Sequence, residues 1–205
     1  MTSPSVAERK RALRAEMLAA RGRLPPAERE AASRALAERV AALPAFAAAR
    51  TVALYLAMGA EVDPAEIARR AGAAGKRLAW PRVEPGATRL AFAAGAPGDF
   101  VPGPGGTRQP PPDAAPIPLE EIDLVLVPGL AFDASGRRLG RGRAHYDATL
   151  AALPRRAARV GLCFEVQLVP EVPCEAHDAP LDAVVTERRA IVAGPARKEP
   201  PPSGR

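Results

Sequence analysis

One short segment constrains the fold of this chain more than any other. Ile122–Val127 reads IDLVLV, an apolar run with a single charged residue, and Pro128 follows it at once. Such a run is typical of a β-strand buried in a sheet, and a proline ends it because proline lacks the N–H that a hydrogen-bonded ladder needs. We therefore predict a core strand at 122–127.

The segments around this strand alternate between helix and strand patterns. Further strands are predicted at 51–57, 77–80, 89–93, 159–164 and 183–186, and helices at 5–22, 25–43, 63–74 and 145–153. Pro44 is expected to end the second helix, and Pro81 is expected to end the strand at 77–80. Alternation of this kind, after a helical N-terminal arm at 1–44, predicts an α/β fold with a largely parallel open sheet covered on both faces.

The chain is expected to form one domain with irregular segments at its surface. Residues 1–194 are assigned to this domain, and the Gly- and Pro-rich stretch 95–116 is predicted to be a surface loop. Residues 195–205 form a Pro-rich basic tail, which we expect to be disordered.

The net charge favours an anionic partner. The chain has 29 Lys and Arg against 23 Asp and Glu, a net charge of +6. A nucleic acid, a membrane surface, or a phosphorylated or carboxylated small molecule would fit this excess. A GC-rich coding sequence also produces arginine- and alanine-rich proteins, so composition leaves the cause open. Aromatic residues make up only 4%, which disfavours a stacking platform for single-stranded nucleic acid.

Cysteine usage and hydropathy bear on the compartment. Cys163 and Cys174 are too few for a disulfide framework or a zinc site, and we expect both to be reduced. No apolar run approaches the roughly 20 residues of a membrane span, and the N-terminus lacks the apolar middle of a signal peptide. The expectation is a cytoplasmic protein that does not contact membranes.

The strongest chemical signal is the segment Gly136–Asp147, GRRLGRGRAHYD. Its glycines permit close backbone approach, and successive N–H groups in such a loop can bind an anion. Its four arginines can pair with phosphate oxygens, and Asp147 is a candidate magnesium ligand. A solvated basic turn would have the same composition, so this alternative stays open.

Three other segments could contribute to a phosphate or metal site. Lys10 and Arg14 are four residues apart and share one face of the first predicted helix. Glu61 follows a predicted strand, and Asp182 precedes the last one, where it could join Asp147 around a hard cation. The ordinary interpretations are a solvated helix face and polar loop residues.

Seven segments together resemble the 5-formyltetrahydrofolate cyclo-ligase family, also called 5,10-methenyltetrahydrofolate synthetases. They follow the family's order: Lys10–Arg14 (KRALR), Met58–Glu61 (MGAE), Trp80–Val83 (WPRV), Asp123–Asp133 (DLVLVPGLAFD), Arg138–Asp147 (RLGRGRAHYD), Gly161–Phe164 with Gln167-Leu168 (GLCF, QL), and His177–Val184 (HDAPLDAV). The resemblance implies a three-layer α/β/α fold of the sugar-phosphate isomerase and CoA-transferase type.

The resemblance also implies an activity. The expected enzyme uses ATP and Mg²⁺ to cyclise 5-formyltetrahydrofolate to 5,10-methenyltetrahydrofolate, with release of ADP and phosphate. In the family's mechanism the formyl oxygen attacks the γ-phosphate, which gives a phosphorylated formyl (imidate) intermediate. The neighbouring nitrogen then closes the ring and expels phosphate. The expected partners are ATP and a reduced folate, with no nucleic acid, and the expected state is a monomer.

The resemblance assigns roles position by position. The implied nucleotide contacts are Lys10, Arg11, Ala12, Leu13 and Arg14, together with Arg138, Leu139, Gly140, Arg141, Gly142, Arg143, Ala144, His145 and Tyr146. Arg141, Arg143 and Tyr146 are the implied catalytic residues. The implied folate contacts are Leu56, Met58, Glu61 and Tyr146, with Glu61 holding the pterin, and Asp147 and Asp182 are the implied magnesium ligands.

Two other functions stay open at this point. Many family members have glycine and tyrosine where this chain has Ala144 and His145. Because alanine takes a positive φ less cheaply than glycine, the loop could belong to a non-catalytic protein on the same fold that binds a nucleotide or RNA. A kinase or ligase acting on another formylated or carboxylated small molecule is the second alternative.

Overall fold

The computed structural model describes residues 4–142, 145–175 and 178–193. Its centre is a seven-stranded sheet in the order β11-β10-β9-β6-β1-β2-β3. The strand bounds are β1 Thr51–Ala53, β2 Arg77–Arg82, β3 Ala91–Ala93, β6 Leu124–Pro128, β9 Ala158–Leu162, β10 Ala183–Val185 and β11 Ala190–Val192. The five inner strands are parallel, whereas β3 and β11 pair antiparallel at the two edges. The predicted α/β fold with a largely parallel sheet is confirmed.

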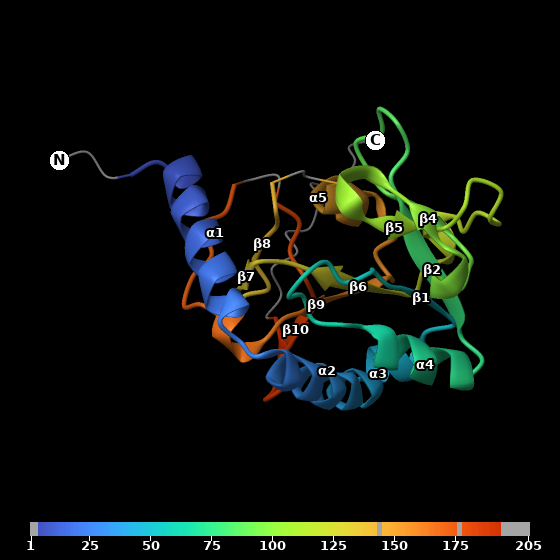
Figure 1. Cartoon of the computed structure of the whole chain (residues 1–205), viewed down its shortest axis with the longest axis horizontal. Coiled ribbons are helices and arrows are strands. Elements are labelled where there is room, and N and C mark those ends of the chain that lie inside the picture. The colour runs from blue at the N-terminus through green and yellow to red at the C-terminus, as the bar shows by residue number, and fades with distance from the viewer. Residues whose placement is uncertain (1–3, 143–144, 176–177, 194–205) are drawn as a thin grey trace, which may run out of the picture.

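Helices cover both faces of this sheet. Their bounds are α1 Val6–Gly22, α2 Pro26–Ala41, α3 Pro44–Ala48, α4 Ala65–Ala73 and α5 His145–Ala152. Figure 1 shows α2, α3 and α4 along one face, α5 over the other, and α1 to the side. None of the helices in the described ranges has both the length and the apolar character needed to cross a bilayer.

The two faces of the sheet explain why residues 124–127 of β6 are all apolar. Leu124 and Leu126 of β6 pack in the core beneath α2 and α4, whereas Val125 and Val127 pack in the core beneath α5. All four side chains are fully buried. A strand with a core on each side needs no polar face, so the pattern does not alternate.

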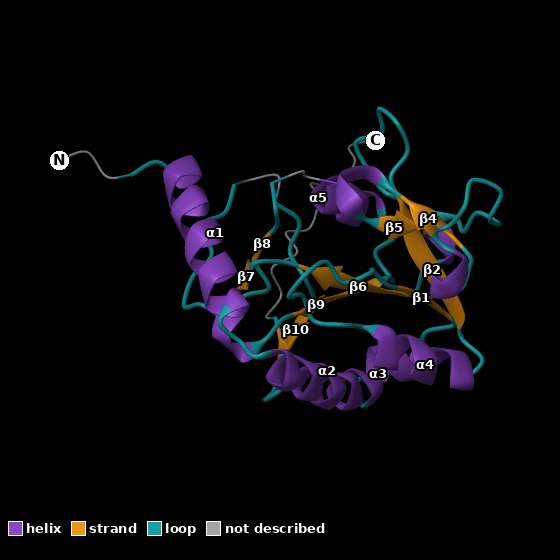
Figure 2. Cartoon of the chain, viewed as in Figure 1, coloured by secondary structure: helices purple, strands orange, loops and turns teal. Residues whose placement is uncertain are grey.

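Two short hairpins lie outside the main sheet. One pairs β4 Val101–Pro102 with β5 Arg108–Gln109, and the other pairs β7 Ala131–Phe132 with β8 Arg138–Leu139. Figure 2 shows the β4–β5 hairpin on the side of the sheet that carries α5. The stretch 95–116, predicted to be a plain surface loop, therefore contains a hairpin. Single 3-10 turns span Pro97–Asp99, Pro104–Gly106, Leu119–Glu121 and Glu165–Gln167.

Two prolines have roles that differ from those expected. Pro44 does not simply end a helix: it starts α3, at a first helical position where no N–H is needed. Pro81 lies within β2 and pairs with Phe92 of β3. β1 pairs with β2 only as far as Ala79, so at Pro81 the only neighbour of β2 among the described strands is β3. The missing N–H of Pro81 therefore breaks no hydrogen bond to β1.

Some of the sequence-based expectations concern segments outside the described residues. The tail at 195–205 is one of them, and Arg143, Ala144 and His177 are the others.

Candidate active site

A cavity of about 480 Å³ opens at the carboxyl ends of β1, β2 and β6. This is the edge where α/β sheets bind ligands. Most of the predicted site residues line it: Lys10, Arg14, Leu56, Met58, Glu61, Arg138, Leu139, Gly140, Arg141, Gly142, His145, Tyr146 and Asp147. The structure therefore brings the N-terminal helix, the segment after β1 and the arginine-rich loop to one place.

Lys10 and Arg14 project from α1 toward this cavity. The Lys10 ammonium lies 2.7 Å from carboxylate oxygens of both Glu175 and Asp178. Burial alone would lower the pKa of Lys10, but the hydrogen bonds and charges of the two acids outweigh it and raise that pKa. Arg14 donates from Nε to the Gly140 carbonyl at 3.0 Å. Arg14 thus ties α1 to the arginine-rich loop, and Lys10 ties it to the segment that carries Glu175 and Asp178.

The remaining residues of the KRALR segment do not line the cavity. Arg11 and Ala12 are exposed, and Leu13 packs against a small core that contains Met17 and Leu139. Helical geometry explains the split, because positions 10 and 14 share one face while 11 to 13 lie on others.

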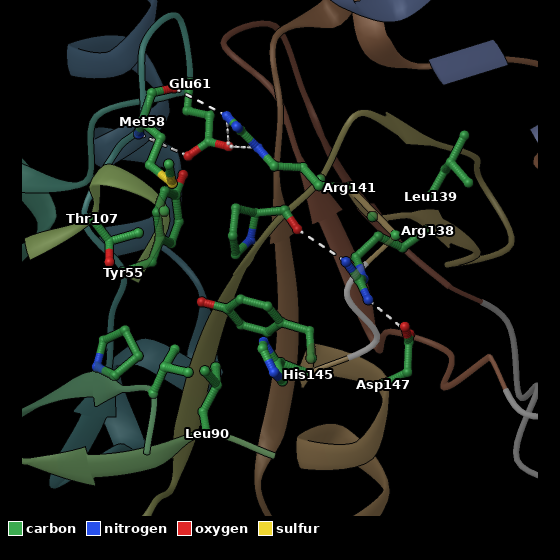
Figure 3. Close-up of a pocket in the computed structure, with 18 of the residues that line it drawn as sticks. Tyr55, Met58, Glu61, Leu90, Thr107, Arg138, Leu139, Arg141, His145 and Asp147 are labelled. Atoms are coloured by element: carbon green, nitrogen blue, oxygen red, sulfur yellow. Dashed lines mark hydrogen bonds and ion pairs between the residues drawn. The ribbon is translucent and has the colours of Figure 1, made fainter. Parts of the chain in front are cut away.

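Arg138 lies at the centre of the loop side of the cavity (Figure 3). Its buried guanidinium donates from Nη2 to Asp147 at 2.7 Å and from Nη1 to the Pro128 carbonyl at 3.3 Å. The guanidinium carbon also lies 5.6 Å from the centre of the Tyr146 ring. The remaining donor, Nε, is buried and has no hydrogen-bond partner in the described part of the chain. An acceptor supplied by a ligand would satisfy it.

The two tyrosines of the cavity are neutral at physiological pH. Burial raises the pKa of Tyr146, and the charge of Glu61 raises it further, against a smaller opposing effect of Arg138. Burial also raises the pKa of Tyr55, whose hydroxyl donates to the Val62 carbonyl at 2.8 Å. Tyr146 is therefore suited to donating a hydrogen bond, and it is not suited to acting as a base.

Two glycines of the loop have local roles that a larger residue would disturb. Gly142 has a φ of 97°, which side-chain-bearing residues rarely adopt. A Cβ on Gly140 would lie 2.7 Å from Nη1 of Arg138. Gly142 permits the turn, and Gly140 permits the Arg138 guanidinium to pass close to the backbone.

Arg141 and Glu61 meet across the cavity (Figure 3). Arg141 donates from Nη2 and Nε to one Glu61 oxygen, at 2.7 and 3.0 Å, and from Nη2 to the Met58 carbonyl at 3.3 Å. The other Glu61 oxygen accepts from the Met58 N–H at 2.9 Å, and Nη1 of buried Arg21 lies 3.9 Å from Glu61. Arg141, which was expected to contact the nucleotide, therefore contacts Glu61, which was expected to contact the pterin.

The structure does not bring Asp182 and Asp147 together, although the sequence predicted that they share a cation. Asp182 accepts a hydrogen bond from the Arg159 N–H at 2.8 Å, at the amino ends of β9 and β10. Asp147 lines the cavity, which is at the carboxyl ends of the strands and therefore at the opposite end of the sheet. Across the described ranges there is no group of three or more His, Cys, Asp or Glu side chains that could hold a metal ion.

Sequence reasoning missed several residues of the cavity. Asp178 lies in the HDAPLDAV segment of the resemblance and Glu175 just before it, but nothing in the residue pattern indicates that both pair with Lys10. The hairpin residues gave no signal, because Gly- and Pro-rich sequence is typical of any surface loop. The additional lining residues are Tyr55, Pro81, Val83, Leu90, Pro104, Gly105, Thr107, Arg108, Gln109, Pro128, Gly129, Glu175 and Asp178.

Comparisons with known proteins bear on the family and the fold of the chain. Residues 6–187 match the 5-formyltetrahydrofolate cyclo-ligase family. The 5-formyltetrahydrofolate cyclo-ligase of Mycolicibacterium smegmatis is 34% identical over 186 residues, 88% of this chain and 95% of that protein. The Escherichia coli K12 protein of the same name is 33% identical over 80% of this chain and 92% of its own length.

A solved structure gives the same result at the level of the fold. The 5,10-methenyltetrahydrofolate synthetase of Aquifex aeolicus superposes with a TM-score of 0.79 at 29% identity, and the match covers 95% of this chain and 97% of that one. Sequence and fold therefore agree over nearly the whole chain. The chain belongs to the 5-formyltetrahydrofolate cyclo-ligase family.

Proposed function

We propose that this chain is an enzyme that cyclises 5-formyltetrahydrofolate to 5,10-methenyltetrahydrofolate at the cavity described above, and that it consumes ATP. The observation that supports this most directly is the meeting of the arginine-rich loop and the Met58–Glu61 segment at one cavity. Family membership supplies the reaction class. The geometry suggests where each reactant would bind.

The loop side of the cavity fits the phosphates of ATP. Lys10, Arg14, Arg138 and Arg141 place four cations around it. Guanidinium groups pair with phosphate oxygens, often through two hydrogen bonds. The buried, unpartnered Nε of Arg138 is a donor that a phosphate oxygen would satisfy. Arg143, outside the described residues, stays a predicted phosphate partner.

Asp147 is the acid that would hold Mg²⁺ together with the phosphates. Magnesium in nucleotide sites is commonly bound by one or two carboxylates, with phosphate oxygens and water completing its shell. A single carboxylate in the cavity is therefore sufficient, and a preformed cluster of acids is not needed. When bound, the ion neutralises charge on the phosphoryl group that is transferred. Asp147 also holds the Arg138 guanidinium.

The opposite side of the cavity fits a reduced folate. Tyr55, Leu56, Met58 and Leu90 give it apolar walls for a flat ring system. Glu61 can accept hydrogen bonds from the amino-substituted pterin once it separates from Arg141. We propose that this ion pair exchanges partners when the reactants bind, so that Arg141 turns to phosphate and Glu61 to the pterin.

The proposed chemistry requires positioning more than covalent participation of the protein. The formyl oxygen attacks the γ-phosphorus and ADP leaves. The neighbouring N–H nitrogen then attacks the formyl carbon and loses its proton, the carbon–oxygen bond breaks, and the departing phosphate carries that proton away. Arg141 would stabilise charge on the transferred group. Tyr146, kept neutral by its raised pKa, can donate a hydrogen bond to an oxygen of either reactant.

An absorbance assay tests this function. Purified protein with 5-formyltetrahydrofolate, ATP and Mg²⁺ should form the methenyl chromophore, with one ADP released for each product molecule. Omission of ATP or chelation of Mg²⁺ should stop the reaction. If the complete mixture forms no chromophore, the proposed function is wrong. The ADP measurement then distinguishes an enzyme, which consumes ATP, from a protein that only binds a nucleotide or RNA.

A further inference from the structure

The cavity has a second cationic side, formed by Arg108 of β5. The other cations of its described lining are Lys10 and Arg14 of α1, Arg138 of β8, and Arg141 of the segment between β8 and α5. In Figure 1, α1 and β8 lie on one side of α5 and β5 lies on the other. Arg108 therefore enters the cavity from the side away from the proposed phosphate site.

The β4–β5 hairpin holds Arg108 in place through two anchors. The Arg108 guanidinium donates to the carbonyl of Phe100, a buried residue whose ring packs edge-to-face on Trp80 at 5.5 Å between centroids. The neighbouring side chain of Gln109 accepts from the Val83 N–H at 3.1 Å, which ties β5 to the end of β2. Arg108 is therefore attached to the rigid sheet although it lies on a hairpin.

The charge of Arg108 is not neutralised by an acid in the described part of the chain. Lys10, Arg138 and Arg141 each form an ion pair, and Arg14 is bound to the arginine-rich loop. Arg108 bonds only to a carbonyl there, and a guanidinium carries five N–H donors. Most of its donors are thus available to a ligand in the cavity.

The chemistry of the proposed substrate suggests what would occupy this side. Between the two cationic sides the walls are apolar and aromatic, with Tyr55, Met58, Val83 and Leu90 among them. In a reduced folate one reacting nitrogen, N5, belongs to the pterin ring and the other, N10, joins the pterin side to the aminobenzoyl ring. The glutamyl carboxylates lie at the far end. With the reacting centre beside the phosphates and the pterin at Glu61, the tail would extend toward the hairpin.

We propose that Arg108 binds a carboxylate of the glutamyl tail and so favours substrates that carry this tail. The inference rests on the proposed function, because it takes the folate as the ligand. Arginine suits the task, since its planar fork matches a carboxylate. Because Arg108 is exposed, the expected contribution is that of a solvent-accessible ion pair, about three- to fivefold in affinity.

Two ligands and one substitution test this assignment. Dissociation constants for 5-formyltetrahydrofolate and for 5-formyltetrahydropteroate, which lacks the glutamyl group, are measured by calorimetry without ATP. Arg108→Gln should weaken binding of the first ligand about three- to fivefold and leave binding of the second unchanged. Arg108→Lys should restore part of the loss. Arg77→Gln, at the amino end of β2 and outside the cavity lining, should affect neither ligand.

The other outcomes overturn the assignment. Equal weakening of both ligands would mean that Arg108 only shapes the hairpin, and unchanged binding of both would mean that it makes no contact with the tail. Failure of the proposed function is seen separately, as absence of methenyl product from the wild-type protein, because the binding measurement needs no turnover. A wild-type protein that binds neither ligand would refute both proposals.

Discussion

At the scale of single residues, the contact between Glu61 and Arg141 determines whether the two sides of the cavity are free for ligands. The Glu61 side chain is 8% exposed and that of Arg141 is 43% exposed, so the acid is fixed and the cation can move. Buried Arg21 also lies 3.9 Å from Glu61, and burial lowers its pKa while the charge of Glu61 raises it. Glu61 thus stabilises a buried cation besides its proposed role at the pterin.

Replacing this acid should therefore affect both stability and binding. Glu61→Gln should lower the free energy of unfolding by about 1–2 kcal/mol, because a buried guanidinium loses its nearby charge. It should also raise the KM for the folate. Urea unfolding measures the first effect, with Glu30→Gln as control, since exposed Glu30 pairs with exposed Arg34 and should change stability by less than about 0.5 kcal/mol. Equal stability of both variants would contradict this interpretation.

The sequence predicted which side chains carry the chemistry but not which of them meet. Glu61 and Arg141 are 80 residues apart, and nothing in either motif indicates that they bond in the absence of ligand. Likewise, nothing in the sequence around Glu175 and Asp178 indicates that these acids pair with Lys10 of α1. Pairing depends on how loops approach in three dimensions, and residue types alone do not specify it.

At the scale of elements, the segment between β8 and α5 depends on backbone conformation. Gly142→Ala should destabilise the protein by about 1–3 kcal/mol, because alanine would have to adopt a φ of 97°. Activity should fall as well, since the segment carries Arg141. Gly72→Ala is the matched control: Gly72 lies in α4, a Cβ there meets open space, and the change should stabilise the protein by about 0.5–1 kcal/mol. Urea unfolding that gives both changes the same sign would refute this.

The amino ends of β1 and β6 are joined by Asp123. Its carboxylate accepts hydrogen bonds from the N–H groups of Arg50 and Thr51, at 2.9 and 3.0 Å, and from Arg156. Burial raises the pKa of Asp123, but these bonds together lower it below its ordinary value. A lowered folded-state pKa stabilises the protein above the unfolded value, about 3.9, and this stabilisation is lost as the pH falls through the folded value.

Asp123→Asn should therefore reduce the acid sensitivity of the fold. Stability measured by urea unfolding from pH 7 to pH 2 should decline less steeply below about pH 4 in this variant than in the wild type. At neutral pH the variant should be less stable, because an amide offers one acceptor oxygen instead of two. Asp113→Asn, at an exposed loop position, should follow the wild-type curve. An unchanged acid limb for Asp123→Asn would show that this carboxylate does not contribute.

The accuracy of the element predictions followed the length of the apolar pattern. The bounds of β6, β9 and α5 agree with the predictions within two residues, and β6 and β9 are each a continuous run of mostly buried residues. β7 and β8 have two residues each, too few to show any period, and β11 is an edge strand whose residues are mostly exposed. The strand predicted at 51–57 ends at Ala53, and the apolar residues that follow it pack in the core or line the cavity outside the ladder.

At the scale of the whole molecule, the parallel sheet gathers distant segments at one edge. The carboxyl ends of β1, β2 and β6 form the floor of the cavity, and α1 and the β4–β5 hairpin supply its sides. Ligands of α/β sheets bind at the carboxyl ends of the strands, which is where this cavity lies. The sequence predicted the contribution of α1 through Lys10 and Arg14, but not that of the hairpin, because Gly- and Pro-rich sequence is typical of any surface loop.

The central claim is that this cavity, and Arg141 within it, carries out ATP-dependent cyclisation of the folate. The most direct measurement is kcat/KM for methenyl formation in Arg141→Ala, compared with the wild type and with Arg69→Ala, an exposed α4 residue paired with Glu66. We predict a loss of about 10²–10³-fold for Arg141→Ala, as for removal of a donor that stabilises transition-state charge, and less than a twofold change for Arg69→Ala. Activity of Arg141→Ala within twofold of the wild type would contradict the claim.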